Sequence, residues 1–275
     1  MATPIYVLTN HKGGVGKSTS ATNLAYGILL VMQKAEVENP RVLLIDTDSQ
    51  GHTTLVTTGR DDYGQHDSLH TVLVADRQNS YRILLNSCLP SSWHPSLFVL
   101  PASKLLDNTE RELLNTSGAP YRLSKALEPI AHYFNAIVID TRPSFSLMTV
   151  MALLSATDAL IPVEPRYLET TGMLSAMNQI IEIRDGWERP NLRIKGILVT
   201  KMDRRIKGHL DSVKALEEHQ ALGSLLYGII PANEAVSYTH SQHSSVLSYD
   251  PQSSASKAYF KVAIQLVKDM YSEVR

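Results

Sequence analysis

A glycine-rich loop near the N-terminus constrains the fold of this chain more than any other feature of its sequence. Residues 10–19 read Asn-His-Lys-Gly-Gly-Val-Gly-Lys-Ser-Thr, and they lie between a short β-rich run at 5–9 and a segment with apolar residues at helical spacing. The glycines let backbone N–H groups turn inward around an anion, and the helix that follows adds the positive end of its dipole. A strand, such a loop and a helix in this order predict a phosphate-binding loop.

The second half of this loop carries the strongest signal, Gly16-Lys17-Ser18. Lys17 is expected to reach the β and γ phosphates of a nucleotide, and the Ser18 hydroxyl is expected to ligate Mg²⁺. The first half departs from the usual G-x-x-x-x-G-K-S/T spacing, because His11 stands where a glycine is expected and Lys12 follows it. Lys12 could reach a phosphate held by another subunit, or it could be a solvated surface lysine. The predicted nucleotide contacts in the loop are Gly13, Gly14, Val15, Gly16, Lys17, Ser18 and Thr19.

Continuous apolar runs along the rest of the chain predict a parallel sheet, because strands buried on both faces have this pattern. The runs lie at 41–46, 97–100, 136–140, 159–163, 194–200 and 225–230. Stretches long enough for crossover helices separate most of them, for example 105–114, 168–184 and 210–222. The expected fold is α/β, with a doubly wound, mostly parallel sheet flanked by helices. Residues 56–96 and 232–256 are rich in Ser, His, Asn and Gln and are expected to be long surface excursions.

Composition limits the organisation of the chain and its partners. The sequence has 275 residues without a repeat or a linker, so we expect a single P-loop domain over 1–275. Lys and Arg total 26 against 27 Asp and Glu, so binding to nucleic acid or anionic lipid would need a local patch. The one cysteine, Cys88, excludes an intramolecular disulfide and favours a reducing, cytosolic compartment. No window reaches the roughly 18 apolar residues that cross a bilayer, so the chain is not expected to span a membrane, and no membrane partner is expected in the leading interpretation.

Two aspartates end predicted strands, which places them at the edge of the sheet where open α/β folds bind ligands. Asp140 is expected to hold Mg²⁺, through a water molecule, together with Ser18. Asp46 ends the run at 41–46 and is expected to face the phosphates, although a turn or helix cap is the alternative. Asp48 is more ambiguous, because it could order the following segment or stabilise the turn.

These segments resemble the ParA/MinD superfamily of P-loop ATPases. Lys12-Gly-Gly-Val-Gly-Lys-Ser18 resembles its deviant Walker A loop, whose signature lysine contacts nucleotide across an ATP-bound sandwich dimer. Residues 43–51 resemble its second motif, 100–106 its mid-chain strand-to-helix junction, 137–141 its Walker B strand, and 249–259 its ParA branch in particular. The resemblance covers most of the chain and implies hydrolysis of ATP to ADP and phosphate, with ATP and Mg²⁺ as cofactors. It implies catalytic roles for Lys12 and Lys17, and it makes Asp46 the residue that positions or deprotonates the attacking water.

The resemblance also implies a base pocket and a DNA-binding face. The loops after the runs at 194–200 and 225–230 would flank the nucleotide base, and the expected contacts are Met202, Pro231 and Asn233. A cationic cluster on the first of these loops could meet DNA phosphates without reading sequence. The candidate DNA-binding residues are Arg204, Arg205, Lys207 and Lys214.

Three positions depart from the family pattern. Relatives usually have proline, asparagine and arginine at the positions of Arg142, Met151 and Ala235, respectively. Arg142 could add positive charge near the site. Because Ala235 lacks a charge, the DNA-binding surface is expected to be partly redistributed. Lys257, Lys261 and Lys268 could extend a basic surface, but solvated lysines on a packed terminal helix are favoured. His240 and His243 are the best pair for a metal site, and no third ligand is evident.

The expected function is DNA partition. ATP would drive a homodimer that binds nonspecific double-stranded DNA, and a ParB-like adaptor would stimulate hydrolysis, which moves plasmid or chromosome cargo. Such a protein would be cytoplasmic and associated with the nucleoid. The alternatives are a MinD-like, membrane-associated division-site ATPase and a ParA-like ATPase that positions a protein cargo.

Overall fold

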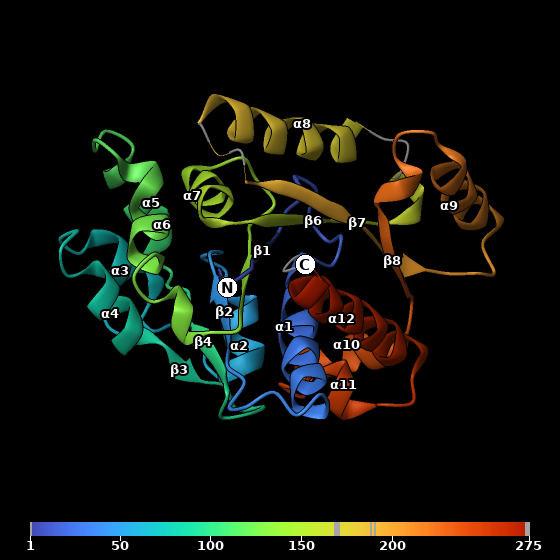
Figure 1. Ribbon diagram of the computed structural model, residues 1–275, viewed down its shortest axis with the longest axis horizontal. Helices are drawn as coiled ribbons and strands as arrows, with labels where there is room; N and C mark the ends of the chain where they lie inside the picture. The colour runs from blue at the N-terminus through green and yellow to red at the C-terminus, as the bar shows by residue number, and fades with distance from the viewer. Residues whose placement is uncertain (1, 168–170, 188, 190, 273–275) are drawn as a thin grey trace.

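One mixed sheet runs through the molecule, and the computed structural model describes residues 2–167, 171–187, 189 and 191–272. Its strands are β1 (Ile5–Leu8), β2 (Val42–Asp46), β3 (Leu89–Pro90), β4 (Leu97–Leu100), β5 (Ala136–Asp140), β6 (Asp158–Val163), β7 (Arg193–Met202) and β8 (Leu226–Pro231). The eight strands follow the order β3-β4-β2-β5-β1-β6-β7-β8, and each adjacent pair is parallel except β3 with β4 (Figure 1). The expected doubly wound, mostly parallel fold is confirmed.

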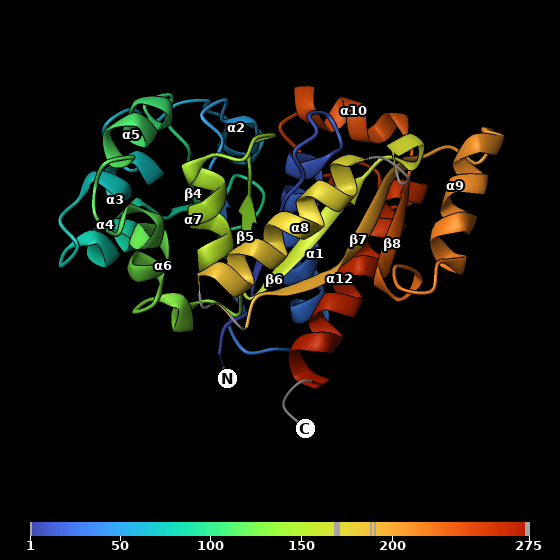
Figure 2. The ribbon, with the colours of Figure 1, turned by 90° about the horizontal axis from the view of Figure 1, so that it is seen from above.

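Helices cover both faces of the sheet (Figures 1 and 2). One face is covered by α1 (Lys17–Lys34), α11 (Val246–Tyr249) and α12 (Ser254–Ser272). The opposite face is covered by α3 (Leu69–Val74), α4 (Ser80–Ser87), α5 (Leu106–Leu113), α6 (Arg122–Leu127), α7 (Leu147–Ser155), α8 (Thr171–Gly186) and α9 (Lys207–Glu218). Two further helices are α2 (His52–Thr58) and α10 (Glu234–Ser241), and four short 3-10 turns complete the described elements.

The strands are apolar at almost every position because each face of the sheet has its own core. Ile5 and Val7 of β1 pack into the core beneath α7 and α8, whereas Tyr6 and Leu8 pack into the core beneath α1 and α12. Side chains of a strand point alternately to its two faces, and in many sheets one face is buried and apolar while the other is exposed and polar. When both faces are buried, apolar residues occupy both sets of positions. This explains why continuous runs identified the central strands correctly.

The prediction of long surface excursions at 56–96 and 232–256 is wrong. The first segment contains α3 and α4, whose Leu69, Leu73 and Leu84 are buried in the core, and the second contains α10 and α11. These helices have four to eight residues, so their apolar positions are too few to show a period among polar neighbours. The two-residue strand β3 was missed for the same reason.

The remaining expectations about elements agree with the structure where it describes the chain. The helix expected at 168–184 begins at Thr171 in the structure, and residues 168–170 lie outside the described part. Over the described residues, none of the helices combines the length and the apolar character needed to cross a membrane.

Candidate nucleotide site

A cavity of about 680 Å³ lies beside the phosphate loop, within the usual size range of small-molecule sites. Five segments line it: the loop and start of α1 at 14–19, the segment after β2 at 48–52, the turn after β5 at 141–144, residue 201 of β7, and residues 236–237 of α10. Since β2 and β5 are parallel neighbours, their carboxyl ends open at the same edge of the sheet. The cavity therefore has the position that open α/β folds use for ligands.

The phosphate loop needs glycine at two positions. Gly14 and Gly16 have φ angles of 76° and 83°, a left-handed conformation that other residues adopt at a cost. Gly16 also precedes the first residue of α1, so the positive end of that helix points at the loop. Thr200 fastens the loop to β7 by donating its hydroxyl to the Val15 carbonyl at 2.8 Å. The loop is thus a preformed anion cradle, as the sequence predicts.

Lys17 lies almost entirely buried within this cradle. Its Nζ donates to the Lys12 carbonyl at 2.9 Å. Burial lowers the pKa of Lys17, whereas the charges of Asp140 and Asp48 raise it. The ammonium therefore lies among the groups expected to surround a nucleotide phosphate.

Asp46 and Asp140 lie side by side as register partners at the ends of β2 and β5. Both side chains are 0% exposed. Asp46 Oδ1 accepts a hydrogen bond from the Asp48 amide at 3.1 Å, and Oδ2 accepts from the Thr54 amide at 2.8 Å and the Thr54 hydroxyl at 2.7 Å. Burial, followed by repulsion from Asp140, raises the pKa of Asp46. Asp46 therefore ties the turn after β2 to α2 and does not line the cavity.

Asp140 has an unused oxygen. Its Oδ2 accepts from the Thr53 hydroxyl at 2.7 Å, while its buried Oδ1 has no hydrogen-bond partner among the described residues. Burial raises the pKa of Asp140, although the Thr53 and Ser18 hydroxyls lower it. An orphaned carboxylate oxygen beside the Ser18 hydroxyl fits a hard cation such as Mg²⁺, which takes oxygen ligands.

Asp48 is the aspartate of the second motif that lines the cavity. Its side chain is half-buried, and its Oδ1 accepts from the Gln50 amide at 3.1 Å. Asp48 also interacts electrostatically with Lys17 and Asp140. The geometry thus separates the two aspartates of this motif, with Asp46 behind the cavity wall and Asp48 in it.

Arg142 fastens the turn after β5 to its neighbours. Its guanidinium pairs with Asp107, pairs with Glu110 at 3.0 Å and donates to the Ser49 hydroxyl at 2.6 Å. The side chain is 15% exposed. Arg142 lines the cavity, as the sequence suggested that it could, and Asp107 and Glu110 partly balance its charge. Met151, another departure from the family pattern, is a buried core residue of α7.

Replacing Arg142 by alanine is expected to lower the free energy of unfolding by about 1–3 kcal/mol, because it leaves the Glu110 carboxylate without its guanidinium partner. Arg111→Ala is the matched control, since this exposed arginine of α5 has no ion pair among the described residues and should stay within about 0.5 kcal/mol of the parent. Urea unfolding measures both. Equal stability of the two variants would contradict this account.

Lys201 is a cavity residue that sequence reasoning missed. Its Nζ donates to the Gly14 carbonyl and pairs with Glu164 at 2.8 Å, which joins the phosphate loop to the end of β6. Lys201 also lines the cavity together with Val236 and Ser237 of α10. The segment Thr200-Lys-Met-Asp203 was recognised as a site loop, but only the contacts reveal which of its side chains faces the cavity.

The three predicted base contacts do not line the cavity. Met202 is 5% exposed and belongs to the core, and Pro231 is its register partner on β8. The Asn233 side chain caps α10 by accepting from the Ala235 amide at 2.9 Å and donates to the Ser254 hydroxyl at 3.2 Å. The two expected loops do meet, but Lys201, Val236 and Ser237 form the wall on that side.

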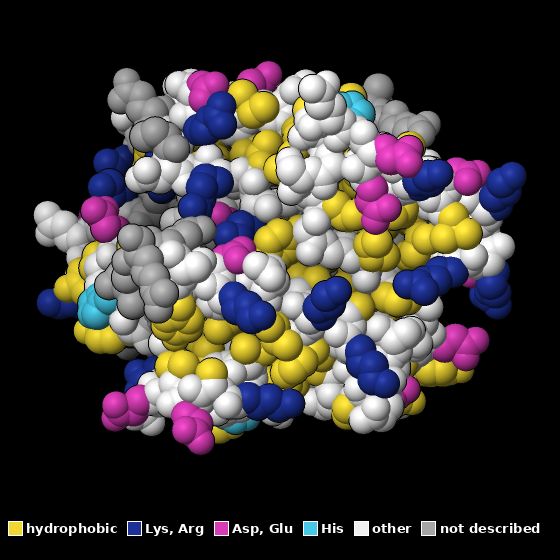
Figure 3. Space-filling view, turned by 45° about the vertical axis from the view of Figure 1, so that its right-hand side comes forward, with side chains coloured by type: hydrophobic (Ala, Val, Ile, Leu, Met, Phe, Trp, Pro, Cys, Tyr) yellow, Lys and Arg dark blue, Asp and Glu magenta, His cyan; other side chains and the backbone are white. Residues whose placement is uncertain are grey.

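The predicted cationic cluster is exposed, and part of it is already paired. Arg205 pairs with Asp203 of its own loop at 2.8 Å, and Lys214 lies 3.7 Å from Glu218. Arg204 and Lys207 have no ion pair in the described part of the chain. Figure 3 shows positive side chains spread over this side of the molecule, interrupted by acidic and hydrophobic ones. Ala235 is buried, so that position offers no DNA contact.

Among the described residues, the terminal helix and the histidines add no further ligand site. The apolar side of α12 packs into the core with α1, and Lys257, Lys261 and Lys268 are exposed, which supports the packed-helix interpretation. His243 Nδ1 hydrogen-bonds the Leu55 carbonyl at 3.1 Å, and the side chain of His240 lies outside the described residues. Across the described residues, no group of three or more His, Cys, Asp or Glu could hold a metal ion. Burial raises the pKa of Cys88 to about 12.

Comparison with known proteins decides the family. A family model described as an AAA domain matches residues 3–194. The chain is 32% identical over 272 residues to the chromosome partitioning protein ParA of Caulobacter vibrioides, which covers 97% of this chain and 95% of that protein. The chain belongs to the ParA/MinD superfamily of P-loop ATPases. This ParA-type ATPase is also 28% identical to the sporulation initiation inhibitor protein Soj of Bacillus subtilis, over 94% of this chain and 96% of Soj.

A solved structure confirms the fold of this ParA-type ATPase. Cobyrinic acid a,c-diamide synthase from Mycobacterium smegmatis, solved with a bound ATP analog and magnesium, superimposes with a TM-score of 0.77 at 24% identity. The match covers 98% of this chain and 97% of that one. The chain is accordingly an ATPase of the partition or positioning class, and the residues around Lys17, Ser18 and Asp140 fit ATP and Mg²⁺.

Proposed function

We propose that this ATPase is a DNA-partition switch whose ATP-bound homodimer binds nonspecific double-stranded DNA and releases it after hydrolysis. A ParB-like adaptor stimulates turnover, which moves plasmid or chromosome cargo in the cytoplasm along the nucleoid. The observation that carries the proposal is the cavity lined by Lys17, Ser18 and Asp48, beside which the buried Asp140 keeps an oxygen without a partner among the described residues. The chain that holds it is similar to a chromosome partitioning protein over nearly its whole length.

The chemistry rests on groups of this chain. Lys17 and the amides of the phosphate loop bind the β and γ phosphates, and the Ser18 hydroxyl and Asp140 hold Mg²⁺. When bound, Mg²⁺ offsets negative charge on the phosphate oxygens. The ATP analog and magnesium in the Mycobacterium smegmatis protein of the same fold support this assignment. Phosphoryl transfer then needs mainly positioning and electrostatic stabilisation, which a preformed loop provides.

Asp48, rather than Asp46, is the proposed residue that orients the attacking water. A residue in this role must present an oxygen to the water at hydrogen-bond distance. Asp48 lines the cavity, whereas Asp46 is 0% exposed and accepts three hydrogen bonds from Asp48 and Thr54. Asp46 then acts as a positioning residue, because it fixes the turn that carries Asp48.

The proposed DNA surface is centred on the loop between β7 and α9. Arg204 of this loop and Lys207, the first residue of α9, are exposed cations without an ion pair in the described part of the chain, and they would supply the main phosphate contacts. Arg205 would contribute less, because Asp203 neutralises it at 2.8 Å. Contacts of this kind attract DNA without reading its sequence.

Salt-dependent DNA binding tests this surface. With ATP bound, the double variant Arg204→Ala/Lys207→Ala is expected to bind duplex DNA more weakly and to reduce the slope of log K against log salt by about 2, one for each lost phosphate contact. Asp203→Asn is expected to strengthen binding, because it releases Arg205. The matched control is Lys257→Ala/Lys261→Ala on the outer side of α12, which should leave the slope unchanged.

Two other results would favour one of the alternative functions. Binding to anionic liposomes without binding to DNA would favour a MinD-like membrane function, although the apolar side of α12 is buried against α1 and is not available to insert. Unchanged DNA binding in the double variant would place the DNA surface elsewhere on the molecule, whereas an ATPase cycle without any DNA binding would leave a positioning role for protein cargo.

A further inference from the structure

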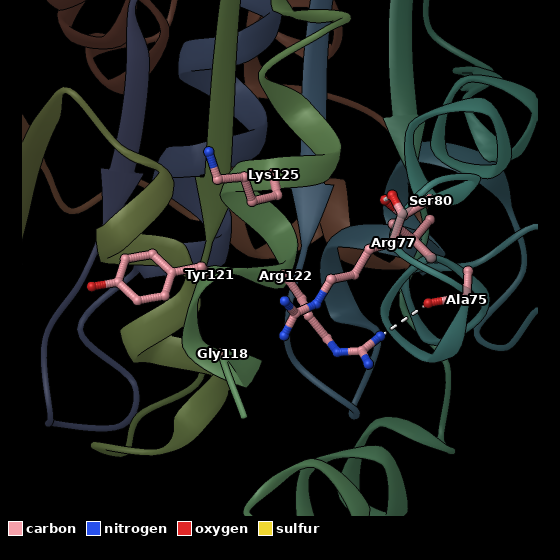
Figure 4. A pocket seen from close by; sticks show the side chains of 8 residues that line it. Ala75, Arg77, Ser80, Gly118, Tyr121, Arg122 and Lys125 are labelled. Atoms are coloured by element: carbon pink, nitrogen blue, oxygen red, sulfur yellow. Dashed lines mark hydrogen bonds between the residues drawn. The ribbon is translucent and has the colours of Figure 1, made fainter. Parts of the chain in front are cut away.

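A second cavity, of about 190 Å³, lies on the side of the molecule formed by α3, α4 and α6 (Figure 4). Its walls come from the turn between α3 and α4 and from the segment at 118–125. It shares no lining residue with the nucleotide cavity. We refer to it as the α3–α6 pocket. Its function is not explained by the ATPase cycle.

Two arginines dominate the charge of the α3–α6 pocket, and none of its lining residues is acidic. Arg122 is held rigidly, because its Nη1 donates to the carbonyls of Leu73 at 2.7 Å and Ala75 at 3.0 Å. Its Nε is buried and has no hydrogen-bond partner among the described residues. A guanidinium fixed in this way retains a donor that the protein itself does not satisfy.

Arg77 is brought to the same place by a glycine. Its Nη2 donates to the Ser117 carbonyl, and a Cβ atom at Gly118 would lie only 2.6 Å from that nitrogen. Gly118 also has a φ angle of 69°, which disfavours other residues. The backbone is therefore shaped so that a second guanidinium can occupy the pocket.

The two guanidinium groups repel each other. Their side chains cross in the view of Figure 4. Burial and then the charge of Arg77 lower the pKa of Arg122, whereas the charge of Asp76 raises it. Nearby acidic groups do not fill the pocket: Asp76 is exposed and does not line it, and Glu128 is paired with Lys125 at 2.9 Å. An arrangement that holds two cations together over a cavity is stabilised by an anion between them.

We propose that the α3–α6 pocket binds a small phosphate-type anion, either free phosphate or the phosphate group of a small metabolite. Paired guanidinium forks match the oxygens of a tetrahedral phosphate, and the pocket is far smaller than the nucleotide cavity. The bound anion joins the α3–α4 turn to the start of α6. This site is independent of the proposed DNA-partition function.

Calorimetric titration with inorganic phosphate tests the proposal, on protein saturated with ADP and Mg²⁺ so that the phosphate loop is occupied. The parent is expected to bind phosphate in a saturable way, and Arg77→Gln should weaken binding about 10-fold or more, the equivalent of one lost charged contact. Arg82→Gln removes the same charge from an exposed arginine of α4 outside the pocket and should bind like the parent.

Two further measurements test the role of Arg122 and the kind of phosphate that the pocket admits. Arg122→Gln should weaken phosphate binding as well, and its thermal unfolding curve shows whether the variant is folded. Titration with glucose 6-phosphate distinguishes free phosphate from the phosphate group of a metabolite as the ligand, since only a pocket that admits phosphate esters binds it. Absence of saturable phosphate binding, or equal affinity in the parent, Arg77→Gln and Arg82→Gln, would overturn the proposal without affecting the ATPase assignment.

Discussion

Replacing Asp48 by alanine is expected to lower kcat for ATP hydrolysis about 100- to 10,000-fold, the usual contribution of a residue that orients or deprotonates a nucleophile. The reason is its position, because Asp48 lines the cavity beside Lys17, whereas Asp46 is buried behind the wall. The variant should still bind ATP, since the phosphate loop and Asp140 are unchanged. Steady-state hydrolysis and equilibrium binding of a fluorescent ATP analogue measure the two effects separately.

The matched comparison is between Asp48→Asn and Asp46→Asn, which remove the same charge two residues apart. Asn at position 46 retains one oxygen that can accept from Thr54, so that variant should fold and lose less activity than Asp48→Asn. The family resemblance alone predicts the opposite, with Asp46→Ala trapping the ATP-bound dimer. If Asp46→Asn blocks hydrolysis and Asp48→Asn turns over normally, the water-orienting role returns to Asp46.

The sequence predicts the centre of this molecule well because its signals there are local. The strands β2 and β5 are apolar throughout, since both their faces are buried, and the phosphate loop carries its residues within one short segment. The positions of Lys17, Ser18 and Asp140 follow directly, because the carboxyl ends of parallel strands meet at one edge.

The sequence does not distinguish Asp46 from Asp48, since both follow the same strand and both fit a turn. The distinction depends on Thr54, eight residues further along, whose amide and hydroxyl fix Asp46. The place of Lys201 in the cavity and the ion pairs of Arg142 were missed for a similar reason. Their partners Glu164, Asp107 and Glu110 lie more than 30 residues away in the chain, so no local pattern indicates the contacts.

Replacing Lys12 by alanine is expected to prevent ATP-dependent dimerisation while ATP still binds to the monomer. The backbone at this position is already fixed, because the Lys12 amide donates to Asn10 Oδ1 at 3.0 Å and its carbonyl accepts from Lys17 Nζ at 2.9 Å. Alanine retains both backbone groups, so the loop should keep its shape. Only the side chain proposed to reach the partner's phosphate is lost, at a cost of about 2–5 kcal/mol of dimerisation free energy.

Sedimentation with ATP or ADP measures this effect, with Asp48→Ala as the parent so that ATP is not consumed. Lys257→Ala is the control, since it removes an exposed lysine of α12 far along the chain from the loop and should dimerise normally. Lys17→Ala provides the contrast, because it removes the Nζ bonded to the Lys12 carbonyl and should abolish ATP binding itself. A Lys12→Ala variant that dimerises with ATP like its parent would show that Lys12 is a surface lysine. The proposal that Lys17 serves ATP binding and Lys12 serves dimerisation would then be wrong.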